Sequence, residues 1–342
     1  MPKEVRQKVP TQADVARLAG VSRPMVSYVL NNSTSVSVAP ETRKRILDAI
    51  AKLAYKPDSM AQSLRTGKTR TIAGFIPDIT NPFYPAFQRG IQDVARRYQF
   101  GVITYNTDGL EEEERQCLEW MQQGRVDGVI GTFWHLTADD LGGVLGRNVA
   151  VVKMCVGPSD VQDIPIDYIY VDNAAAAKCA VTYLIDKGHT RIGMIGGQTA
   201  PPRQMRVLGY QQALAEHHLS LDESLLQGGD FAEGGGYTAM QSLLKTRPLP
   251  TAVFAANDLM AIGALLAIRE AGLSVPDDIA IVGFDDIPAA KMVHPALTTI
   301  TQFAHNMGVR AAEMLFERLA EPGRFGMRVA ECPFELIVRD SA

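Results

Sequence analysis

Polar side chains follow several short apolar runs in this sequence. Asp78 and Asn81 come after "TIAGFIP", Asp285 ends "IAIVGFD", and Gln302 follows "TTIT". The same candidate set includes Phe83, Tyr84, Arg206, Phe231 and Asn257. Carboxylate, amide and guanidinium groups make directed hydrogen bonds, and aromatic faces stack on a sugar ring or a base. We therefore expect these residues to bind a small polar molecule.

Asparagine and aspartate at the end of a strand can instead cap the helix that follows. We expect this capping role for Asp258 and Asp286. Their neighbours Asn257 and Asp285 are expected to bind the ligand, together with Arg206 and Gln302.

Motifs for catalysis are missing from the sequence. It contains no GxSxG and no HExxH, and its six histidines are isolated or lie in "EHHL". "RTGKT" is not a phosphate-binding loop, because Gln62 stands where that motif needs glycine. The four cysteines form no CxxC pair and read as reduced core residues of a cytosolic protein. The sequence predicts no enzymatic activity, no cofactor and no metal site.

Buried strands and amphipathic helices alternate from Thr71 onward. "TIAGFIPD", "GVITYNTD", "VDGVIGTF" and "VAVVKMCV" are strands of parallel-sheet type. A second series follows in "RIGMIGGQ", "TAVFAAND" and "IAIVGFDD". This duplication predicts an α/β body of two doubly wound parallel-sheet subdomains, in which ligands lie beyond the carboxyl ends of the strands.

The N-terminal residues predict a small all-α head. Thr11 caps a first helix in "TQADVARLAG", which ends at Gly20, and Ser22 caps a second helix in "VSRPMVSYVLNN". A third helix runs from Pro40 to about Leu53. We expect Leu18 of the first helix and Ile46, Leu47, Ile50 and Leu53 of the third to face inward. Two short helices joined by a tight turn match a helix-turn-helix, although an unrelated three-helix bundle would show the same pattern.

The outward face of the second helix is expected to hold Arg23, Pro24, Met25, Ser27 and Tyr28. Arg23 can bridge the O6 and N7 atoms of guanine, and Met25 and Tyr28 can contact a thymine methyl group or a phosphate. Residues 1–70 carry 13 basic and 5 acidic side chains, a net charge of +8, whereas the whole chain has −4. The head is therefore the part expected to bind a polyanion.

A nine-residue segment, 57–65, joins the head to the body, with Met60, Ala61 and Leu64 at helical spacing. Isolated helices shorter than ~12 residues are marginal in water. We expect this hinge to order only when something packs against it; the alternative is a plain linker helix.

These stretches resemble a known family. "DVARLAGVSRPMVSYVLNN" and "TRKRILDAIAKLAYKPDSMAQSLRTGKT" are similar to the head and hinge of the lactose/galactose repressor family of bacterial transcription regulators, and the likeness continues to the last strand. The resemblance implies a helix-turn-helix domain at 9–56, a hinge at 57–68 and a periplasmic-binding-protein-like effector and dimerisation domain at 70–342. Its N-subdomain would be about 70–168 with 303–330, and its C-subdomain about 169–300 with 331–342.

The resemblance also implies residue roles. Arg23, Pro24 and Tyr28 would face operator bases, while Thr11, Ser22, Ser27 and Thr42 would hold phosphates. Leu64 would be a wedge in the minor groove, and Ala61 would make the close contact between two paired hinges. Ala39 departs from the family pattern, which often has Ser or Thr before Pro40, so the third helix lacks a side-chain cap.

The candidate pocket resembles the sugar site shared by these repressors and periplasmic pentose- and hexose-binding proteins. Cys155 and Val156 stand where sugar-binding relatives often carry Asp or Asp-Arg. Purine-responsive relatives use further polar residues in the stretch before Arg206, which here reads "TAPPRQ". The effector is therefore a sugar-like molecule or, alternatively, a purine or nucleoside.

The expected protein is a ligand-responsive repressor that binds double-stranded operator DNA as a homodimer in the bacterial cytoplasm. A periplasmic sugar receptor is the alternative from another class, but it would need a signal peptide and no basic head. No apolar run approaches the ~20 residues that span a bilayer, so no membrane partner is expected.

Overall fold

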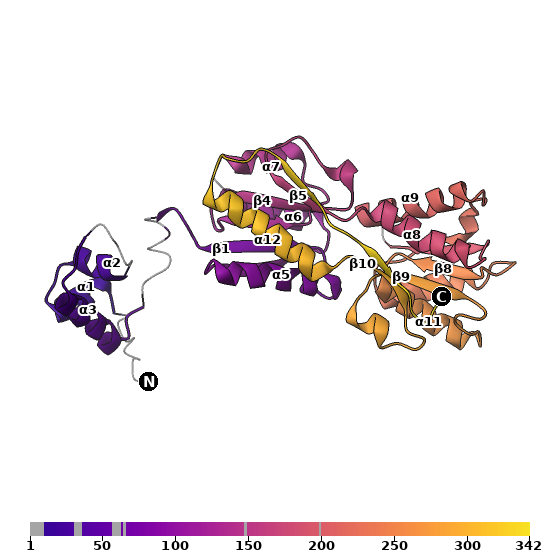
Figure 1. Cartoon of the computed structure of the whole chain (residues 1–342), viewed down its shortest axis with the longest axis horizontal. Coiled ribbons are helices and arrows are strands. Elements are labelled where there is room, and N and C mark those ends of the chain that lie inside the picture. The colour runs from indigo at the N-terminus through magenta and orange to yellow at the C-terminus, as the bar shows by residue number, and fades with distance from the viewer. Residues whose placement is uncertain (1–9, 31–35, 57–62, 64–65, 147–148, 198–199) are drawn as a thin grey trace, which may run out of the picture. The chain divides into compact units, whose positions relative to one another are not determined.

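Three helices form the head in the computed structural model, which describes residues 10–30, 36–56, 63, 66–146, 149–197 and 200–342. They are α1 (Gln12–Ala19), α2 (Arg23–Leu30) and α3 (Pro40–Leu53) (Figure 1). The Thr11 side chain accepts a hydrogen bond from the Asp14 N–H, and Asp14 accepts one from the Thr11 N–H at 3.0 Å. This capping box confirms the predicted start of α1, and Gly20 ends the helix in the left-handed region at φ 66°.

The head has a core of small and branched residues around Val15, Val26 and Ile46, which are fully buried. The expectation that Leu18 and Leu47 face inward was wrong, since they are 45% and 49% exposed. Leu18 comes one residue before a buried position of α1, and Leu47 comes one residue after a buried position of α3. One step along a helix turns the side chain by about 100°.

Met25 also differs from its expected outward position, because it packs against the head core. It lies four residues before the buried Val29 and therefore on the same side of α2. Arg23 and Pro24 are exposed, as predicted.

The body, Arg70–Ala342, is a compact unit separate from Met1–Thr69 and contains two sheets. We call the first sheet and its helices the first lobe. Its strand order is β11-β5-β4-β3-β1-β2, and every pair is parallel. Its strands are β1 (Thr71–Ile76), β2 (Gly101–Asn106), β3 (Gly128–Gly131), β4 (Ala150–Cys155), β5 (Asp167–Tyr170) and β11 (Arg328–Glu331).

The second lobe repeats this plan with the order β12-β10-β9-β8-β6-β7, in which only the β10–β12 pair is antiparallel. Its strands are β6 (Ile192–Gly196), β7 (Leu226–Gly228), β8 (Ala252–Ala255), β9 (Ala280–Asp285), β10 (Thr298–Thr301) and β12 (Glu335–Ile337). The two doubly wound subdomains predicted from the repeated strand pattern are confirmed.

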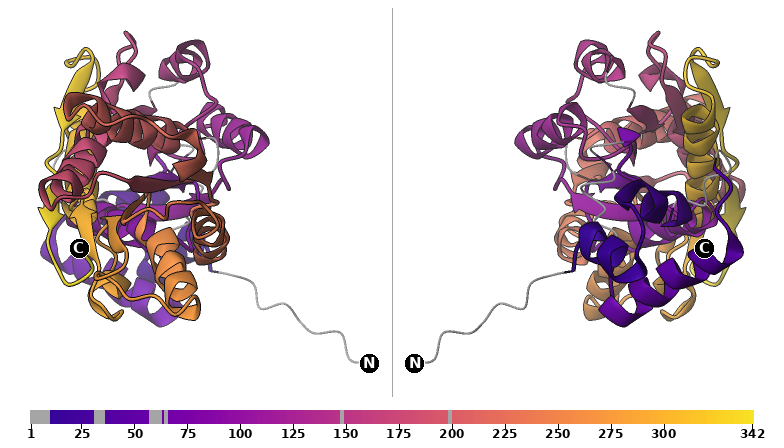
Figure 2. Two further views of the ribbon diagram at one scale, coloured as in Figure 1. Left: turned by 90° about the vertical axis from the view of Figure 1, so that its right-hand side faces the viewer. Right: turned by 90° about the vertical axis from the view of Figure 1, so that its left-hand side faces the viewer.

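Helices cover both faces of each sheet (Figures 1 and 2). In the first lobe α5 (Phe83–Arg97) and α12 (Ala304–Ala320) share one core, and α6 (Glu111–Gln122) and α7 (Ala138–Leu145) contribute to the other. In the second lobe α8 (Asn173–Asp186) packs with α9 (Pro201–Glu216), and α10 (Glu233–Leu243) packs with α11 (Asp258–Glu270). Near-continuous apolar strands are therefore buried on both sides.

The chain passes between the lobes after β5, after β10 and after β11. A buried ion cluster secures the segments that return to the first lobe. Asp167 on β5 is fully buried and receives paired hydrogen bonds from Arg318 of α12 and Arg328 of β11, all between 2.7 and 2.9 Å. These bidentate pairs join β5, α12 and β11 into one unit.

Candidate ligand-binding site and DNA-binding helix

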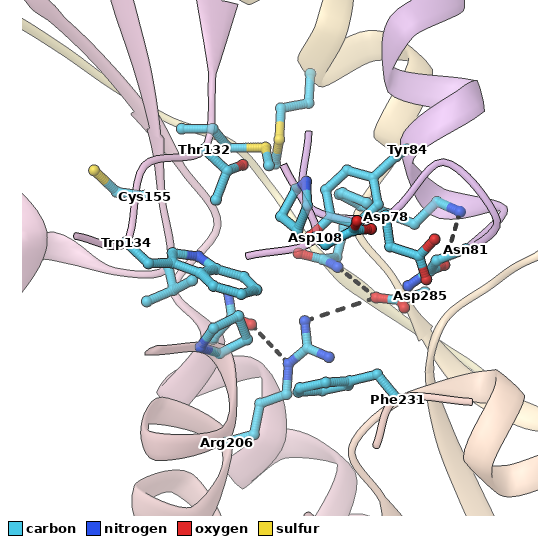
Figure 3. A pocket seen from close by; sticks show the side chains of 18 of the residues that line it. Asp78, Asn81, Tyr84, Asp108, Thr132, Trp134, Cys155, Arg206, Phe231 and Asp285 are labelled. Atoms are coloured by element: carbon cyan, nitrogen blue, oxygen red, sulfur yellow. Dashed lines mark hydrogen bonds and ion pairs between the residues drawn. The ribbon is translucent and has the colours of Figure 1, made fainter. Parts of the chain in front are cut away.

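A cavity of about 200 Å³ lies at the carboxyl ends of the strands, with walls from both lobes (Figure 3). The structure brings eight of the predicted ligand-binding residues to its lining: Asp78, Asn81, Phe83, Tyr84, Arg206, Phe231, Asp285 and Gln302. Strand ends of parallel sheets meet at one edge, which is why residues distant in sequence converge here. The cavity therefore lies at the strand ends where the sequence analysis expected the ligand to bind.

Arg206 is the centre of the second-lobe wall. This α9 residue is 6% exposed, its Nε donates to Asn173 Oδ1 at 2.7 Å, and its Nη1 donates to the Ala256 carbonyl. Its guanidinium carbon lies 3.7 Å from the centroid of the Phe284 ring, a cation–π contact. Burial lowers the pKa of Arg206 from its usual value. The guanidinium is therefore fixed in position before any ligand arrives.

Asp285 completes this wall beside the arginine. Its Oδ1 lies 3.7 Å from Arg206 Nη2 and accepts a hydrogen bond from Gln302 Nε2 at 2.7 Å. Burial raises the pKa of Asp285 to about 6, against the opposing effects of Arg206 and Gln302. The residue adopts φ 113°, a region that residues other than glycine rarely adopt. Such strain is common where a side chain must be aimed at a ligand.

Aromatic rings supply the apolar surface of the cavity. Phe83 and Tyr84 meet edge to face with their centroids 5.1 Å apart. Burial is also the main reason that the pKa of Tyr84 is raised, so its hydroxyl stays protonated. Phe231 has φ 65° and its ring lies over Gly197, where a Cβ atom would collide with it. The rings offer faces for stacking on a planar or cyclic ligand.

Asn257 takes the helix-capping role that was expected for Asp258. Asn257 caps α11 through a hydrogen bond from the Met260 N–H at 2.9 Å, donates to the Phe231 carbonyl at 2.8 Å, and is not among the residues that line the cavity. Asp258 does not act as the cap. It accepts hydrogen bonds from the Thr299 hydroxyl and the Ile287 N–H, and burial raises its pKa well above the usual range.

Asp286 was also expected to cap a helix, and this prediction was wrong. It accepts a hydrogen bond from Arg339 Nη2 at 2.6 Å, which ties the end of β9 to the C-terminal segment. The short 3₁₀ helix that follows begins after Ile287 and has no side-chain cap.

Sequence reasoning missed several lining residues, namely Asp108, Thr132, Trp134, Asn173 and Asp230. Four of them follow strand ends, which is the same signal that identified Asp78 and Gln302. Asn173 begins α8 just after the first crossing between the lobes and positions Arg206.

Trp134 reaches the cavity because a buried carboxylate holds its loop. Glu114 on α6 is 1% exposed and accepts hydrogen bonds from the backbone N–H groups of Trp134 and His135, both at 2.8 Å, and of Leu136 at 3.2 Å. The indole packs over Gly109, where a Cβ atom would overlap the ring. The loop after β3 is thus fixed by a charged acceptor, whose hydrogen bonds are stronger than those of neutral groups.

The residues expected to contact DNA lie in the head wherever the structure describes them. Arg23 and Pro24 stand exposed at the first turn of α2, whereas Ser27 and Tyr28 are half-buried. Thr11 is engaged in the cap of α1, and Thr42 lies in the first turn of α3 within 3.5 Å of Arg45. The expected hinge contacts Ala61 and Leu64 lie outside the described residues.

Comparison with known proteins agrees with this division into head and body. Residues 11–58 match the description "Bacterial regulatory proteins, lacI family", and residues 181–342 match a periplasmic binding protein-like domain. The ribose operon repressor of Escherichia coli strain K12 is 37% identical over 337 residues, covering 97% of this chain and 99% of the repressor. This chain belongs to the lacI family of bacterial regulatory proteins.

Other lacI family members are similarly close over nearly the whole chain. The HTH-type transcriptional repressor PurR of Histophilus somni strain 129Pt is 34% identical, covering 97% of this chain and 98% of its own. A structure of the lac repressor dimer bound to operator and the anti-inducer ONPF has a TM-score of 0.86 at 26% identity, covering 98% and 99% of the two chains. The resemblance seen in the sequence and its predicted fold class are confirmed.

Membership of the lacI family makes this chain a DNA-binding transcription regulator with a periplasmic-binding-protein-like effector domain. Family membership also confirms that it is not an enzyme. Among the described residues, no helix is both long and apolar enough to cross a bilayer.

Proposed function

We propose that this lacI family member is a repressor controlled by a small sugar-like effector in the body cavity. The main support for this proposal is the buried group of Arg206, Asp285 and Gln302, which lines a cavity of about 200 Å³ together with aromatic rings. Such a combination of fixed polar groups and ring faces suits a small cyclic ligand with several hydroxyl groups. A drug-sized ligand usually occupies a pocket of at least ~300 Å³, so this cavity suits a smaller molecule.

The proposed DNA complex is a homodimer on a pseudopalindromic operator, formed in the bacterial cytoplasm. A single helix-turn-helix offers a small interface, and two-fold symmetry doubles it. The relative solved as a dimer on its operator supports this arrangement. Arg23, Pro24 and Tyr28 would face bases. Phosphates would be contacted by Thr11, Ser22, Ser27 and Thr42. Met25 packs against the head core, so only the exposed edge of its side chain would reach DNA.

Coupling between cavity and operator is proposed to run through residues 57–68. Effector binding would favour one arrangement of the lobes, and that arrangement would change how readily two hinges pair and place Leu64 in the minor groove, with Ala61 at the contact between them. The effector controls DNA binding only if its affinity differs between the two arrangements.

A purine or nucleoside is the second candidate effector. Phe83, Tyr84 and Phe231 provide ring faces on which a base could stack. The sugar is preferred because the fixed polar groups Arg206, Asp285 and Gln302 suit a ligand that carries several hydroxyl groups.

The central experiment measures operator affinity with and without effector. Operator fragments are selected from random duplex DNA by the purified protein, and affinity is followed by fluorescence anisotropy. Leu64→Ala is expected to weaken operator binding at least 100-fold because the wedge is lost, while ligand affinity stays unchanged. Met292→Ala, on an exposed side chain of the body, is the matched control.

Salt dependence tests the head in the same assay. Affinity should fall steeply as salt rises, since the basic head displaces counterions from the phosphates. An affinity that does not change with salt, or a Leu64→Ala protein that loses DNA and ligand binding equally, would contradict the proposed function.

A further inference from the structure

Two buried hydrogen-bonding groups that follow β3 have no partner in the part of the chain that the structure describes. Thr132 is 3% exposed and its Oγ1 has no hydrogen-bond partner among the described residues. The Nε1 of Trp134 is also buried and lacks a partner within that part of the chain. Both residues line the cavity and lie across it from Asp78 and Asn81 (Figure 3). Buried polar groups in folded proteins are nearly always hydrogen-bonded, so this pair requires an explanation.

A bound ligand explains the unsatisfied pair better than a defect in packing. The Trp134 loop is anchored at three backbone N–H groups by Glu114, so the indole is held in place rather than loosely packed. Met154 and Met307, which also line the cavity, are buried and have flexible side chains that can adapt to a ligand. Cys155 and Val156, at the end of the adjacent β4, provide no carboxylate for this side of the cavity.

The charge of the lining restricts which ligand can enter. Its described residues include the four aspartates Asp78, Asp108, Asp230 and Asp285, and one arginine, Arg206. Arg206 is already engaged by Asp285, Asn173 and a backbone carbonyl. Apart from Arg206, the described lining residues include no basic side chain that could pair with the other carboxylates. A phosphate or carboxylate group would therefore meet like charges and no free cation.

We propose that Thr132 Oγ1 and Trp134 Nε1 form a hydrogen-bonding subsite for an oxygen of the effector, and that the carboxylates Asp78, Asp108 and Asp230 restrict the effector to neutral molecules. This inference rests on the proposed function, because it specifies the ligand of the same cavity. It predicts that unphosphorylated sugars and neutral bases are admitted and that their phosphorylated or acidic derivatives are rejected.

Matched pairs of probes test the charge selection. Ribose is compared with ribose 5-phosphate, glucose with glucose 6-phosphate and gluconate, and hypoxanthine with inosine 5′-monophosphate, in a thermal-shift assay of the full-length protein. At least one neutral probe should raise the melting temperature, and its anionic counterpart should bind at least about 100-fold more weakly. An anionic probe that binds as well as its neutral partner overturns the proposal, and so does a panel in which no neutral probe binds.

Trp134 can report on its own subsite. The chain has two tryptophans, and Trp120 packs against Tyr105 rather than lining the cavity. In a Trp120→Phe background all indole emission comes from Trp134, so the neutral probe should change that emission in a saturable titration. Saturable binding detected by melting temperature without any change in Trp134 emission counts against the subsite.

Two conservative substitutions separate binding from folding. Trp134→Phe keeps an aromatic ring and loses the N–H, and Thr132→Val keeps the shape and loses the hydroxyl. Each should weaken the neutral probe by roughly 3- to 10-fold. Because the Thr132 hydroxyl has no partner to lose, Thr132→Val should leave the melting temperature of the ligand-free protein unchanged or raise it.

Thr298→Val is the matched control for the hydroxyl. Thr298 is also fully buried, but its Oγ1 accepts a hydrogen bond from the Arg339 N–H at 2.9 Å, so its loss should lower the melting temperature and leave probe affinity unchanged. A Thr132→Val protein that behaves like Thr298→Val overturns the subsite. Failure of the proposed function looks different: the probe then binds with the predicted pattern but leaves operator affinity unaltered.

Discussion

The two walls of the cavity satisfy their polar groups in different ways. On the second-lobe wall, Arg206, Asp285 and Gln302 bond to one another or to the protein backbone. On the first-lobe wall, Thr132 and Trp134 present groups that have no partner among the described residues. One wall is preorganised around buried charge, and on the other wall the Thr132 hydroxyl and the Trp134 indole N–H would gain hydrogen bonds from a ligand. The difference suggests that the second lobe orients a ligand while the first lobe responds to it.

The walls also differ in what holds them in place. The buried charged residues Arg206 and Asp285 are themselves part of the second-lobe wall, and burial raises the pKa of Asp285 to about 6. In the first lobe the supporting charge, Glu114, stands behind the wall and bonds only to backbone and to His135. Substitutions in the second lobe should therefore disturb folding and binding together, and those in the first lobe should separate the two effects.

Removal of Arg206 should have the largest effect. Arg206→Ala leaves Asp285 buried without its cation, which typically costs about 3–5 kcal/mol, and removes the central donor of the cavity. We expect the unfolding free energy in urea to drop by that amount and the response of operator binding to effector to vanish.

Arg203→Ala is the matched control for Arg206→Ala, since Arg203 lies on the same helix but is not among the described lining residues. It should change stability by less than about 1 kcal/mol. An Arg206→Ala protein with normal effector response would show that the second-lobe wall does not orient the ligand.

Stability should depend on pH through Asp285. Because burial raises its pKa to about 6 in the folded state, above the ordinary aspartate value, the folded protein binds a proton more tightly than the unfolded chain. The contribution is complete below about pH 4 and is lost as the pH rises through 6. Its size is on the order of 2–3 kcal/mol.

Urea titrations of the wild type and Asp285→Asn from pH 4 to 7 measure this contribution. The wild type should lose stability relative to Asp285→Asn as pH rises. Asp258, whose pKa is raised first by burial and then by the charge of Asp285, loses the second effect in Asp285→Asn, so the measured difference includes that change. A difference that grows in the opposite direction would mean that Arg206 outweighs burial.

Glu114→Gln should have a smaller effect with a different character. Glutamine retains one acceptor oxygen but loses the charge that three backbone N–H groups share, which should cost about 2 kcal/mol. Freed from this anchor, Trp134 should show broader emission in the Trp120→Phe background and weaker probe binding. Glu112→Gln, on the exposed side of α6, is the control and should leave both unchanged.

Asn257→Ser is expected to have the smallest effect. Serine still caps α11 but cannot reach the Phe231 carbonyl, so stability should fall by about 1 kcal/mol and probe affinity by less than threefold. A tenfold loss of affinity at unchanged stability would return Asn257 to the ligand-contacting set expected from the sequence. Isothermal titration of the neutral probe measures the change.

Strand-end positions made much of the cavity predictable. Asp78, Asp285 and Gln302 stand at the ends of apolar runs, and the topology of a parallel sheet brings those ends together. The roles of Asn257 and Asp258 could not be separated from sequence, because both follow the same strand and only the backbone angles decide which side chain turns back onto the helix.

Trp134 was not recognised because its signal is apolar. A tryptophan just after a strand reads as core, and its exposure to a cavity depends on Glu114, which lies 20 residues earlier in the chain. In the head, helical periodicity located the core face but not its edges, so Leu18 and Leu47 were placed inside. Small alanine side chains at the helix contacts reduce the width of the buried face. The sequence does not show how closely two helices approach, so it does not show where that face ends.

The late return of the chain to the first lobe has a consequence for incomplete chains. Asp167 bonds to two arginines that lie more than 150 residues further on, in α12 and β11. A polypeptide that stops after β10 would carry the three helices of the head but would lack both arginines that pair with Asp167. During synthesis the head helices and β5 thus emerge before Arg318 and Arg328, the two partners that join β5 to α12 and β11.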